Sequence, residues 1–364
     1  MKMNKKITQF GLILLTMGLA LTACDTTGSS SDNGEWLIPE SEIRDGGPGR
    51  DGIPSIDDPQ FAPVEEIDFI VGDRLVVGVK NGDDVKAYPH QILDWHEIVN
   101  DEVGGTPFAL TYCPLTGTGI GWHREINGSV TEFGVSGLLF RNNLIPFDRN
   151  TDSEWSQMQL RGVSGELSGT NIERVDVIET NWSTWKEMYP DSEVLTTETG
   201  FSRNYQGFAY GSSYLNNSTT LFPVNNEDDR LHEKERVHGI IANTPASEDS
   251  DVKVYVISRM GQGVEVIEDT FQGIEHVVVG SSSLNFAASF ERTINGTLLN
   301  FQPVEDALPV VMEDQEGNRW DIFGNAVSGP REGQQLTPTR SYTGYWFAWA
   351  DFFPDLEIYQ QQDS

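Results

Sequence analysis

Residues 98–133, IVNDEVGGTPFALTYCPLTGTGIGWHREINGSVTEF, align without a gap with residues 266–301, VIEDTFQGIEHVVVGSSSLNFAASFERTINGTLLNF. The identical positions include acidic, basic, glycine and aromatic residues: Asp101 and Asp269, Gly105 and Gly273, Arg124 and Arg292, Asn127-Gly128 and Asn295-Gly296, Phe133 and Phe301. The sequence therefore predicts an internal duplication that produces two homologous units.

The similarity continues on both sides of these stretches. After small shifts, Trp155 matches Trp320, and the tryptophan-rich segment 182–191 matches 346–355. Features present in both copies should belong to the scaffold, whereas differences mark where chemistry can be placed. Val264 stands in the second copy where the first has His96, and Ser281 stands where the first has Cys113.

Short runs rich in β-branched and aromatic residues, separated by Gly, Asn and Asp, dominate both copies and predict a mostly β fold. The Asn-Gly pairs at 127–128 and 295–296 favour two-residue hairpins, because a type I′ turn needs positive φ at both central residues. Helical patterns are scarce. We expect only short helices near residues 89–95, 182–188 and 346–352.

The N-terminal residues are typical of an export signal for a lipoprotein. Lys2, Lys5 and Lys6 precede an apolar run at 10–21, which is too short to span a bilayer. The following Leu21-Thr22-Ala23-Cys24 fits a lipobox, in which the cysteine becomes the acylated N-terminus. We expect a signal peptide at 1–23, a palmitate-type lipid anchor on Cys24, and an extracytoplasmic location on a membrane of the cell envelope.

The rest of the chain divides by composition. Residues 24–60 are rich in Ser, Gly, Asp and Pro, which predicts a flexible tether. The first β-rich unit is expected at 61–199 and the second, degenerate copy at 237–364. Residues 200–236 form the connection between them, and a loop of this length is often functional.

The charge balance limits the partners. The chain has 24 Lys and Arg against 56 Asp and Glu, a formal net charge of −32. Such acidity disfavours nucleic acid as a partner. A small molecule, a metal or a protein partner stays open. Cys113 is the one thiol left once Cys24 is lipidated, so the mature chain has no intrachain disulfide.

The candidate site follows from a predicted hairpin around Gly104-Gly105. If Val103 faces Thr106, the same register carried along the strands places His96 opposite Cys113. The Cβ atoms of such a pair lie roughly 5 Å apart, close enough for a thiol–imidazole contact.

Three interpretations of this pair remain open. His96 can activate Cys113 as a nucleophilic or redox-active thiolate. Alternatively, Cys113 and His96 can bind copper or zinc, with His90 or His123 completing the site. In the third interpretation Cys113 is a buried packing residue, and the protein is a non-catalytic binding or scaffold lipoprotein.

Four motifs occur in order along the chain: Tyr88-Pro89 followed by WHEIVND at 95–101, YCPLTG at 112–117, FGVSGLL at 133–139 and DRNTDSEWSQ at 148–157. In these motifs the chain resembles a prokaryotic family of mostly exported proteins, catalogued as domain of unknown function thirty-one seventy-nine, over residues 52 to 359. The resemblance implies no activity. It makes Glu97, Asp148, Arg149 and Gln157 further pocket candidates. Some family members have a second cysteine where this chain has Thr116, so a dithiol mechanism is not supported here.

Overall fold

The protein is described by a computed structural model over residues 35–215, 217–242 and 246–360. The predicted signal peptide and Cys24 lie outside the described residues. Within these ranges no helix is long and apolar enough to cross a membrane. The described part is mostly β, as predicted, and its α-helices are short: α1 (His90–His96), α2 (Trp182–Met188), α3 (Ser212–Leu215) and α4 (Trp346–Phe352).

The first half, residues 61–199, contributes strands to three sheets. One has the order β15-β3-β4-β16-β2, formed by Val177–Asn181, Leu75–Asn81, Asp84–Pro89, Glu193–Leu195 and Phe61–Pro63. The second has the order β14-β7-β6-β5, formed by Arg174–Val175, Thr118–His123, Thr106–Cys113 and Ile98–Val103. The third has the order β1-β10-β11-β12-β13, formed by Ile43–Asp45, Phe133–Phe140, Asn143–Asp148, Glu154–Ser156 and Arg161–Ser164.

The second half, residues 236–360, forms three smaller sheets with a similar strand order. Its sheets are β28-β17-β18-β29 (Ser341–Tyr345, Arg236–Ile241, Val252–Val256, Glu357–Ile358), β19-β20-β21 (Glu265–Phe271, Ile274–Ser281, Phe286–Glu291) and β24-β25-β26-β27 (Phe301–Pro303, Val310–Asp314, Arg319–Asp321, Ala326–Ser328). Small hairpins and 3-10 turns complete the halves: β8 (Glu125–Ile126), β9 (Ser129–Val130), β22 (Thr293–Ile294), β23 (Thr297–Leu298), η1 (Glu40–Glu42), η2 (Val64–Glu66) and η3 (Ile257–Arg259).

The local predictions of turns and helices are confirmed. Asn127 and Gly128 have φ of 51° and 79°, and Asn295 and Gly296 have 51° and 77°, as type I′ turns require. Helices α2 and α4 cover the predicted ranges, and α1 begins one residue later than expected. In both halves a glycine of the central strand lies flat against a helix tryptophan, so a Cβ on Gly78 or Gly239 would overlap the ring of Trp185 or Trp349.

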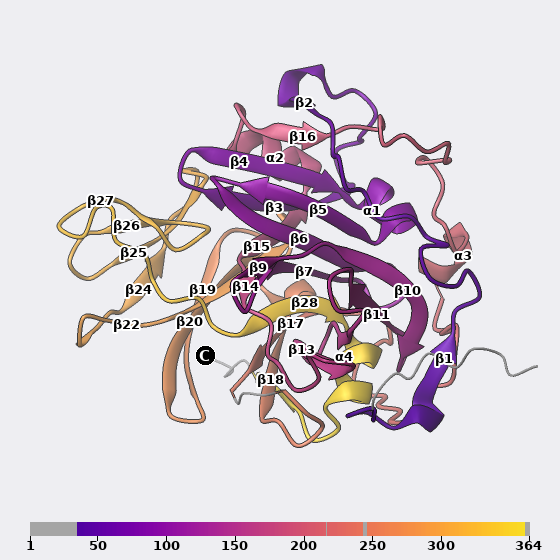
Figure 1. Ribbon diagram of the computed structural model, residues 1–364. Helices are drawn as coiled ribbons and strands as arrows, with labels where there is room; N and C mark the ends of the chain where they lie inside the picture. Colours follow the sequence, from indigo (N-terminus) through magenta and orange to yellow (C-terminus); the bar gives the residue numbers. More distant parts are fainter. Residues whose placement is uncertain (1–34, 216, 243–245, 361–364) are drawn as a thin grey trace, which may run out of the picture. The chain divides into compact units, whose positions relative to one another are not determined.

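The two halves interlock and do not have separate cores. Strand β28 of the second half lies beside β7 of the first, where Tyr345 N donates to Thr116 O (2.8 Å) (Figure 1). The reciprocal contact joins Asn181 N of β15 to Leu284 O (3.5 Å). Trp349 of α4 accordingly shares a hydrophobic cluster with Trp155 of the first half. The described residues form one compact unit.

The expected flexible tether at 24–60 is wrong for its described part. Residues 43–45 form β1, which pairs with β10. Ile38 and Ile56 are buried, and Ile56 forms a β-bridge with Val99. The composition suggested disorder because most residues of this segment are polar. A few apolar residues, Ile38 and Ile56 among them, pack against the rest of the protein.

Candidate functional site

The hairpin that carries Cys113 has the predicted register. Val103 pairs with Thr106 and Ile98 with Thr111, and Tyr112 N donates to Glu97 O at 2.6 Å. Strand β5 begins only at Ile98, however. Glu97 adopts a left-handed conformation (φ 58°) that ends helix α1 at His96. The assumption that His96 extends the strand opposite Cys113 is therefore wrong.

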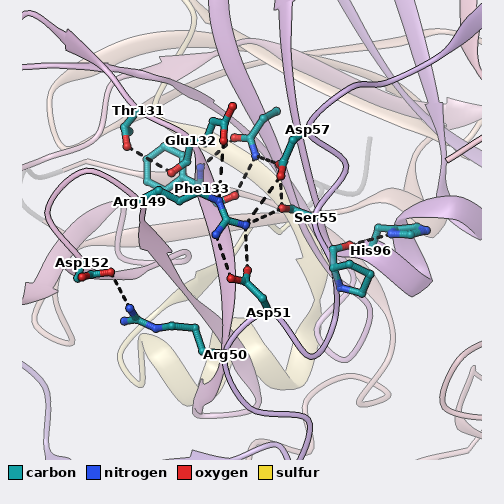
Figure 2. Close-up of polar contacts among 12 residues, drawn as sticks. Arg50, Asp51, Ser55, Asp57, His96, Thr131, Glu132, Phe133, Arg149 and Asp152 are labelled. Atoms are coloured by element: carbon teal, nitrogen blue, oxygen red, sulfur yellow. Dashed lines mark hydrogen bonds and ion pairs between the residues drawn. The ribbon is translucent and has the colours of Figure 1, made fainter. Parts of the chain in front are cut away.

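His96 has partners of its own. It is buried, and its Nδ1 donates to Pro54 O at 2.8 Å. Since a carbonyl only accepts, Nε2 is the acceptor and receives the hydroxyl of Tyr205 at 2.7 Å. Burial lowers the pKa of His96, which keeps the ring neutral. His96, which Figure 2 shows near Ser55 of the N-terminal segment, thus links this segment to the connecting segment. Both of its ring nitrogens are bonded to these two segments and not to Cys113.

Cys113 ends β6 in a fully enclosed position. Its side chain is 1% exposed, and Sγ donates to Asn142 O at 3.6 Å. Burial and, to a smaller extent, the charge of Glu97 raise the pKa of the Cys113 thiol to about 11, against the opposite effect of hydrogen bonds from Thr116 and Leu144. The thiol is neutral near pH 7 in this conformation.

Gln157 holds the turn that follows Cys113. Its Nε2 donates to Thr111 O and Thr118 O (3.0 and 3.2 Å), and its Oε1 accepts from Thr118 Oγ1 and Asn143 Nδ2 (both 2.7 Å). Thr118 is the cross-strand partner of Cys113. The predicted pocket residue Gln157 is therefore a positioning residue for the segment around the thiol.

The β6–β7 turn depends on Gly117. Its φ is +61°, and a Cβ at this position would come within 2.9 Å of the Tyr345 ring of β28. A side chain here would be strained and would displace the second half from the Cys113 turn.

Glu97 is the titratable group that acts on Cys113. It is buried, and burial raises the pKa of its carboxyl to about 7, while a hydrogen bond from the Tyr210 hydroxyl (3.3 Å) lowers it. One turn earlier on α1, burial raises the pKa of Asp94 well above its usual value, and the charge of Glu97 adds to this effect. Asp94, Glu97, Cys113, Tyr210 and Tyr214 are called the Cys113 cluster below.

The connecting segment, predicted at 200–236 and ending before β17 begins at Arg236, covers this cluster. Tyr214 donates its hydroxyl to Leu115 O at 2.9 Å, next to the Cys113 turn. Phe222 exchanges two backbone hydrogen bonds with the Asn142 side chain (2.8 and 3.1 Å). Tyr210 reaches Glu97. The long connection that the sequence marks as functional thus closes the thiol from solvent.

The other predicted ligands lie elsewhere. His90 Nε2 is 3.0 Å from Glu179 Oε2, and its ring contacts Tyr112. His123 pairs with Phe108, five residues along β6 from Cys113, or roughly 17 Å at the usual strand rise. In the part of the chain that the structure describes, no group of three or more His, Cys, Asp or Glu side chains could hold a metal ion.

Asp148 and Arg149 have structural partners. Asp148 is buried and accepts from Thr151 and from Trp155 Nε1 at 3.2 Å. Arg149 forms a two-pronged ion pair with Asp51 (2.9 Å for each bond) and donates to Ser55 at 3.1 Å, as Figure 2 shows. These contacts fasten the N-terminal segment to β11 and leave the Cys113 cluster untouched.

The corresponding place in the second half is different. Ser281 donates to Gln262 O at 2.8 Å, and Glu265 accepts from Gly261 N at 2.6 Å near the surface. Sequence reasoning identified Cys113, Glu97 and Gln157 but missed Asp94, Asn142, Tyr210 and Tyr214. The length of the connection was the only signal for the last two.

The comparisons with known proteins give a family and no activity. No curated protein and no solved structure matches the chain. The family model described as "Protein of unknown function (DUF3179)" matches residues 50–356, which confirms the resemblance noted from the motifs. The chain belongs to this family.

Proposed function

We propose that the protein is a lipid-anchored cell-envelope protein in which Cys113 acts as a reactive thiol and Glu97 accepts its proton. The observation that carries this proposal is that two buried groups lie on directly bonded segments: Tyr112 N, next to Cys113, donates to Glu97 O at 2.6 Å. The pKa of the Cys113 thiol is raised to about 11 and that of the Glu97 carboxyl to about 7, each mainly by burial. A base that titrates near neutrality is suited to take a proton from a weakly acidic thiol.

The chemistry requires the connecting segment to open. The thiol is closed to solvent, so an electrophile reaches it only when Tyr210 and Tyr214 move away. The Cys113 proton then passes to the Glu97 carboxylate, and the sulfur forms a bond to the electrophilic atom as the leaving group departs with its electron pair. Glu97 takes the role that the sequence suggested for His96.

Binding of a soft metal at Cys113 is an alternative to thiol reactivity, and the structure supports it less well. Copper or zinc bound by Cys113, His96 and His90 would need three side chains that converge, and each of the two histidines has other partners. The thiol form needs only Cys113 and Glu97, whose segments are joined by the hydrogen bond from Tyr112 N to Glu97 O.

We also propose that the two halves arose by duplication. The gapless alignment of 98–133 with 266–301 and the repeated strand order support this origin. In the second half Ser281 replaces the thiol, so that half serves as scaffold.

The lipid anchor rests on the sequence at 1–24. A Cys24→Ser variant should no longer incorporate labelled palmitate and should leave the membrane fraction. Recovery of that variant in the membrane fraction would contradict the proposed anchor.

A scaffold role is the second candidate, and the enclosed thiol with its raised pKa favours it. Iodoacetamide labelling at pH 7.5, followed by intact mass, separates the two candidates. A reactive centre should be alkylated well above the rate expected from a pKa of 11, and Glu97→Gln should slow the reaction at least tenfold. Cys113→Ser provides the blank. If Glu97→Gln reacts equally fast or faster, Glu97 is no proton acceptor.

A further inference from the structure

Two strand edges of the second half are open where the corresponding edges of the first half are covered. In the first half, residues 54–63 run along both edges. Ile56 forms a parallel bridge with Val99 of β5, and β2 pairs with the outer side of β16 (Figure 1). In the second half β19 and β29 take the places of β5 and β16. In the described sheets both are edge strands with no further strand paired to them.

The register of the hairpins shows which backbone groups of β19 point outward. In the first half Ile56 N donates to Ile98 O (2.9 Å), and Asn100 N donates to Ile56 O (2.8 Å). Val266 and Glu268 align with Ile98 and Asn100, at the same distances from their hairpin turn. Alternate residues of an antiparallel pair direct their N–H and C=O away from the partner strand. Val266 O and Glu268 N are therefore an outward acceptor and donor on an edge strand.

Side-chain exposure shows the same difference between the halves. Ile98, Val99 and Asn100 are at most 2% exposed beneath residues 54–63. The aligned stretch 266–268 is more open: its central isoleucine is 9% exposed, the valine before it is half-buried, and the glutamate after it is exposed. The second half thus lacks the cover that the first half provides for itself.

A groove of about 200 Å³ lies between the two open edges. Its apolar lining includes Ile267 of β19, Met260, Tyr255 of β18 and Tyr359, which directly follows β29. Tyr359 stacks on Tyr255 with ring centroids 5.1 Å apart, and so supplies the aromatic contact that Phe61 makes in the first half. The aliphatic place of Ile56, beside the β5 strand, has no such substitute in the groove.

The chain's own segments do not fill this place. The segment that precedes β17 packs on the Cys113 cluster and on α4, where Asp228 O accepts from Trp346 Nε1 at 2.9 Å. Residues 25–34 and 361–364, which lie outside the described residues, contain no aliphatic side chain apart from glycine backbone. The occupant is therefore expected to come from another polypeptide.

Charge distinguishes this occupant from residues 54–63. Asp57 accepts from Asn100 Nδ2 (2.7 Å) and lies 3.9 Å from Arg149. The second half has Glu268 in place of Asn100 and Gln315 in place of Arg149. An acidic residue at the position of Asp57 would meet a carboxylate and no guanidinium, whereas a lysine or arginine would meet an opposite charge.

The existing cations do not cancel this preference. Arg292 is shared by Glu268 (2.9 Å) and Glu275 (3.4 Å), so one guanidinium serves two carboxylates. Arg259 and Glu265 line the groove with one charge of each sign. The edge retains net negative charge, as does the whole chain at −32.

We propose that the second half binds an extended segment of a partner protein, parallel to β19, with an aliphatic side chain in the groove and a basic residue directly after it. The aliphatic residue donates its N–H to Val266 O and accepts from Glu268 N, as Ile56 does with the first half. In strand addition, main-chain hydrogen bonds provide affinity and pockets for alternate side chains provide specificity. This binding is independent of Cys113, which lies in the other half.

Synthetic peptides based on residues 54–63 test the chemistry of the occupant. The probe peptide carries Asp57→Lys and Asp58→Lys and a fluorophore at its C-terminus. Fluorescence polarisation with wild-type protein in 150 mM salt should show saturable, one-to-one binding. The peptide with both aspartates retained should bind at least fivefold more weakly, and so should the probe with the added change Ile56→Ala.

Two variants at one position separate backbone pairing from charge. Glu268→Ala and Glu268→Pro both remove the carboxylate, but only proline lacks the N–H. That N–H points away from β20, so the hairpin does not need it. Glu268→Pro should bind the probe at least tenfold more weakly than Glu268→Ala. In wild-type protein the bound probe should slow amide exchange in residues 265–271.

Equal binding by these two variants, or no saturable binding of the probe by wild-type protein, would overturn the proposal. A wild-type dimer in sedimentation that Glu268→Pro abolishes would also overturn it, because the occupant would then be a second copy. If Glu268→Pro does not fold, the Ile56→Ala peptide and the amide exchange still decide. Iodoacetamide should label Cys113 at the same rate with and without the probe, which separates this test from that of the thiol.

Discussion

The two halves share a scaffold down to individual hydrogen bonds, yet only the first encloses a thiol. Tyr88 donates to Asp101 (2.6 Å) in one half, and Tyr255 donates to Asp269 (2.8 Å) in the other. In contrast, Glu97 is buried beside Cys113, whereas its counterpart Glu265 lies near the surface. The chemical difference between the halves therefore depends on whether one carboxyl, Glu97 or Glu265, is buried, and not on the order of the strands.

The largest expected effect on stability comes from a substitution of Gln157, which has no polar counterpart in the second half. The alignment through Trp155 and Trp320 places Ile322 at the equivalent position. Gln157→Leu leaves several buried groups of Thr111, Thr118 and Asn143 without partners, and should lower the unfolding free energy by about 3 kcal/mol. Ile322→Val, the matched change, should cost about 1 kcal/mol. Urea titrations of both variants measure this, and equal losses would contradict the comparison.

Glu97→Gln should stabilise the protein in a pH-dependent manner. The carboxyl has a pKa of about 7 in the folded protein against 4.5 when exposed, so the folded state binds more protons between these values. Stability therefore falls as pH rises from 4.5 through 7, by about 3 kcal/mol at 1.36 kcal/mol per pKa unit.

Glu97→Gln removes this pH-dependent loss of stability, because glutamine does not ionise. Glu97→Gln should be more stable than wild type at pH 8 and equal to it at pH 4, as measured by urea unfolding at both pH values. Glu265→Gln is the matched control and should give the same small change at each pH. A Glu97→Gln variant that gains nothing at pH 8 would mean that Glu97 is solvated.

The shared tyrosines test the scaffold itself. Tyr88→Phe and Tyr255→Phe each remove a buried hydroxyl from an aspartate, and each should cost about 1 kcal/mol. Thermal unfolding should show a loss for each variant, larger for Tyr255→Phe, because the Tyr255 hydroxyl also lies 2.6 Å from His276 Nε2. A loss confined to one half would argue against a common scaffold.

The smallest effect concerns Arg149, which is partly exposed. Arg149→Ala should cost about 0.5 kcal/mol, because exposed ion pairs contribute little. Amide exchange in residues 50–57 should quicken. Gln315→Ala, at the equivalent position after Asp314, should leave that segment unchanged. Equal exchange in all three proteins would show that the segment is held without Arg149.

The sequence was sufficient where the signal is local. The Asn-Gly turns, the β5–β6 register and helices α2 and α4 follow from turn chemistry and residue periodicity. It failed at His96, because a single left-handed residue, Glu97, separates helix from strand and changes the direction of the side chain before it. No propensity scale marks that position.

The residues of the connecting segment that cover the Cys113 cluster could not be predicted from the sequence, for a different reason. Tyr210 and Tyr214 are about 100 residues from Cys113 in sequence, and nothing local states which surface they pack against. The interlocking of the halves was equally hidden, since an alignment says which segments are alike and not which halves exchange contacts. Composition misled at residues 35–60, where a few buried apolar residues outweigh many polar ones.

The pH dependence of Cys113 alkylation tests the central claim most directly. With Glu97 as proton acceptor, the iodoacetamide rate of wild type should rise around pH 7, and Glu97→Gln should lose this rise and follow the thiol alone, toward pH 11. If Glu97 acts only through its negative charge, Glu97→Gln should instead react faster than wild type above pH 7, where the carboxyl is ionised, and that result would contradict the account.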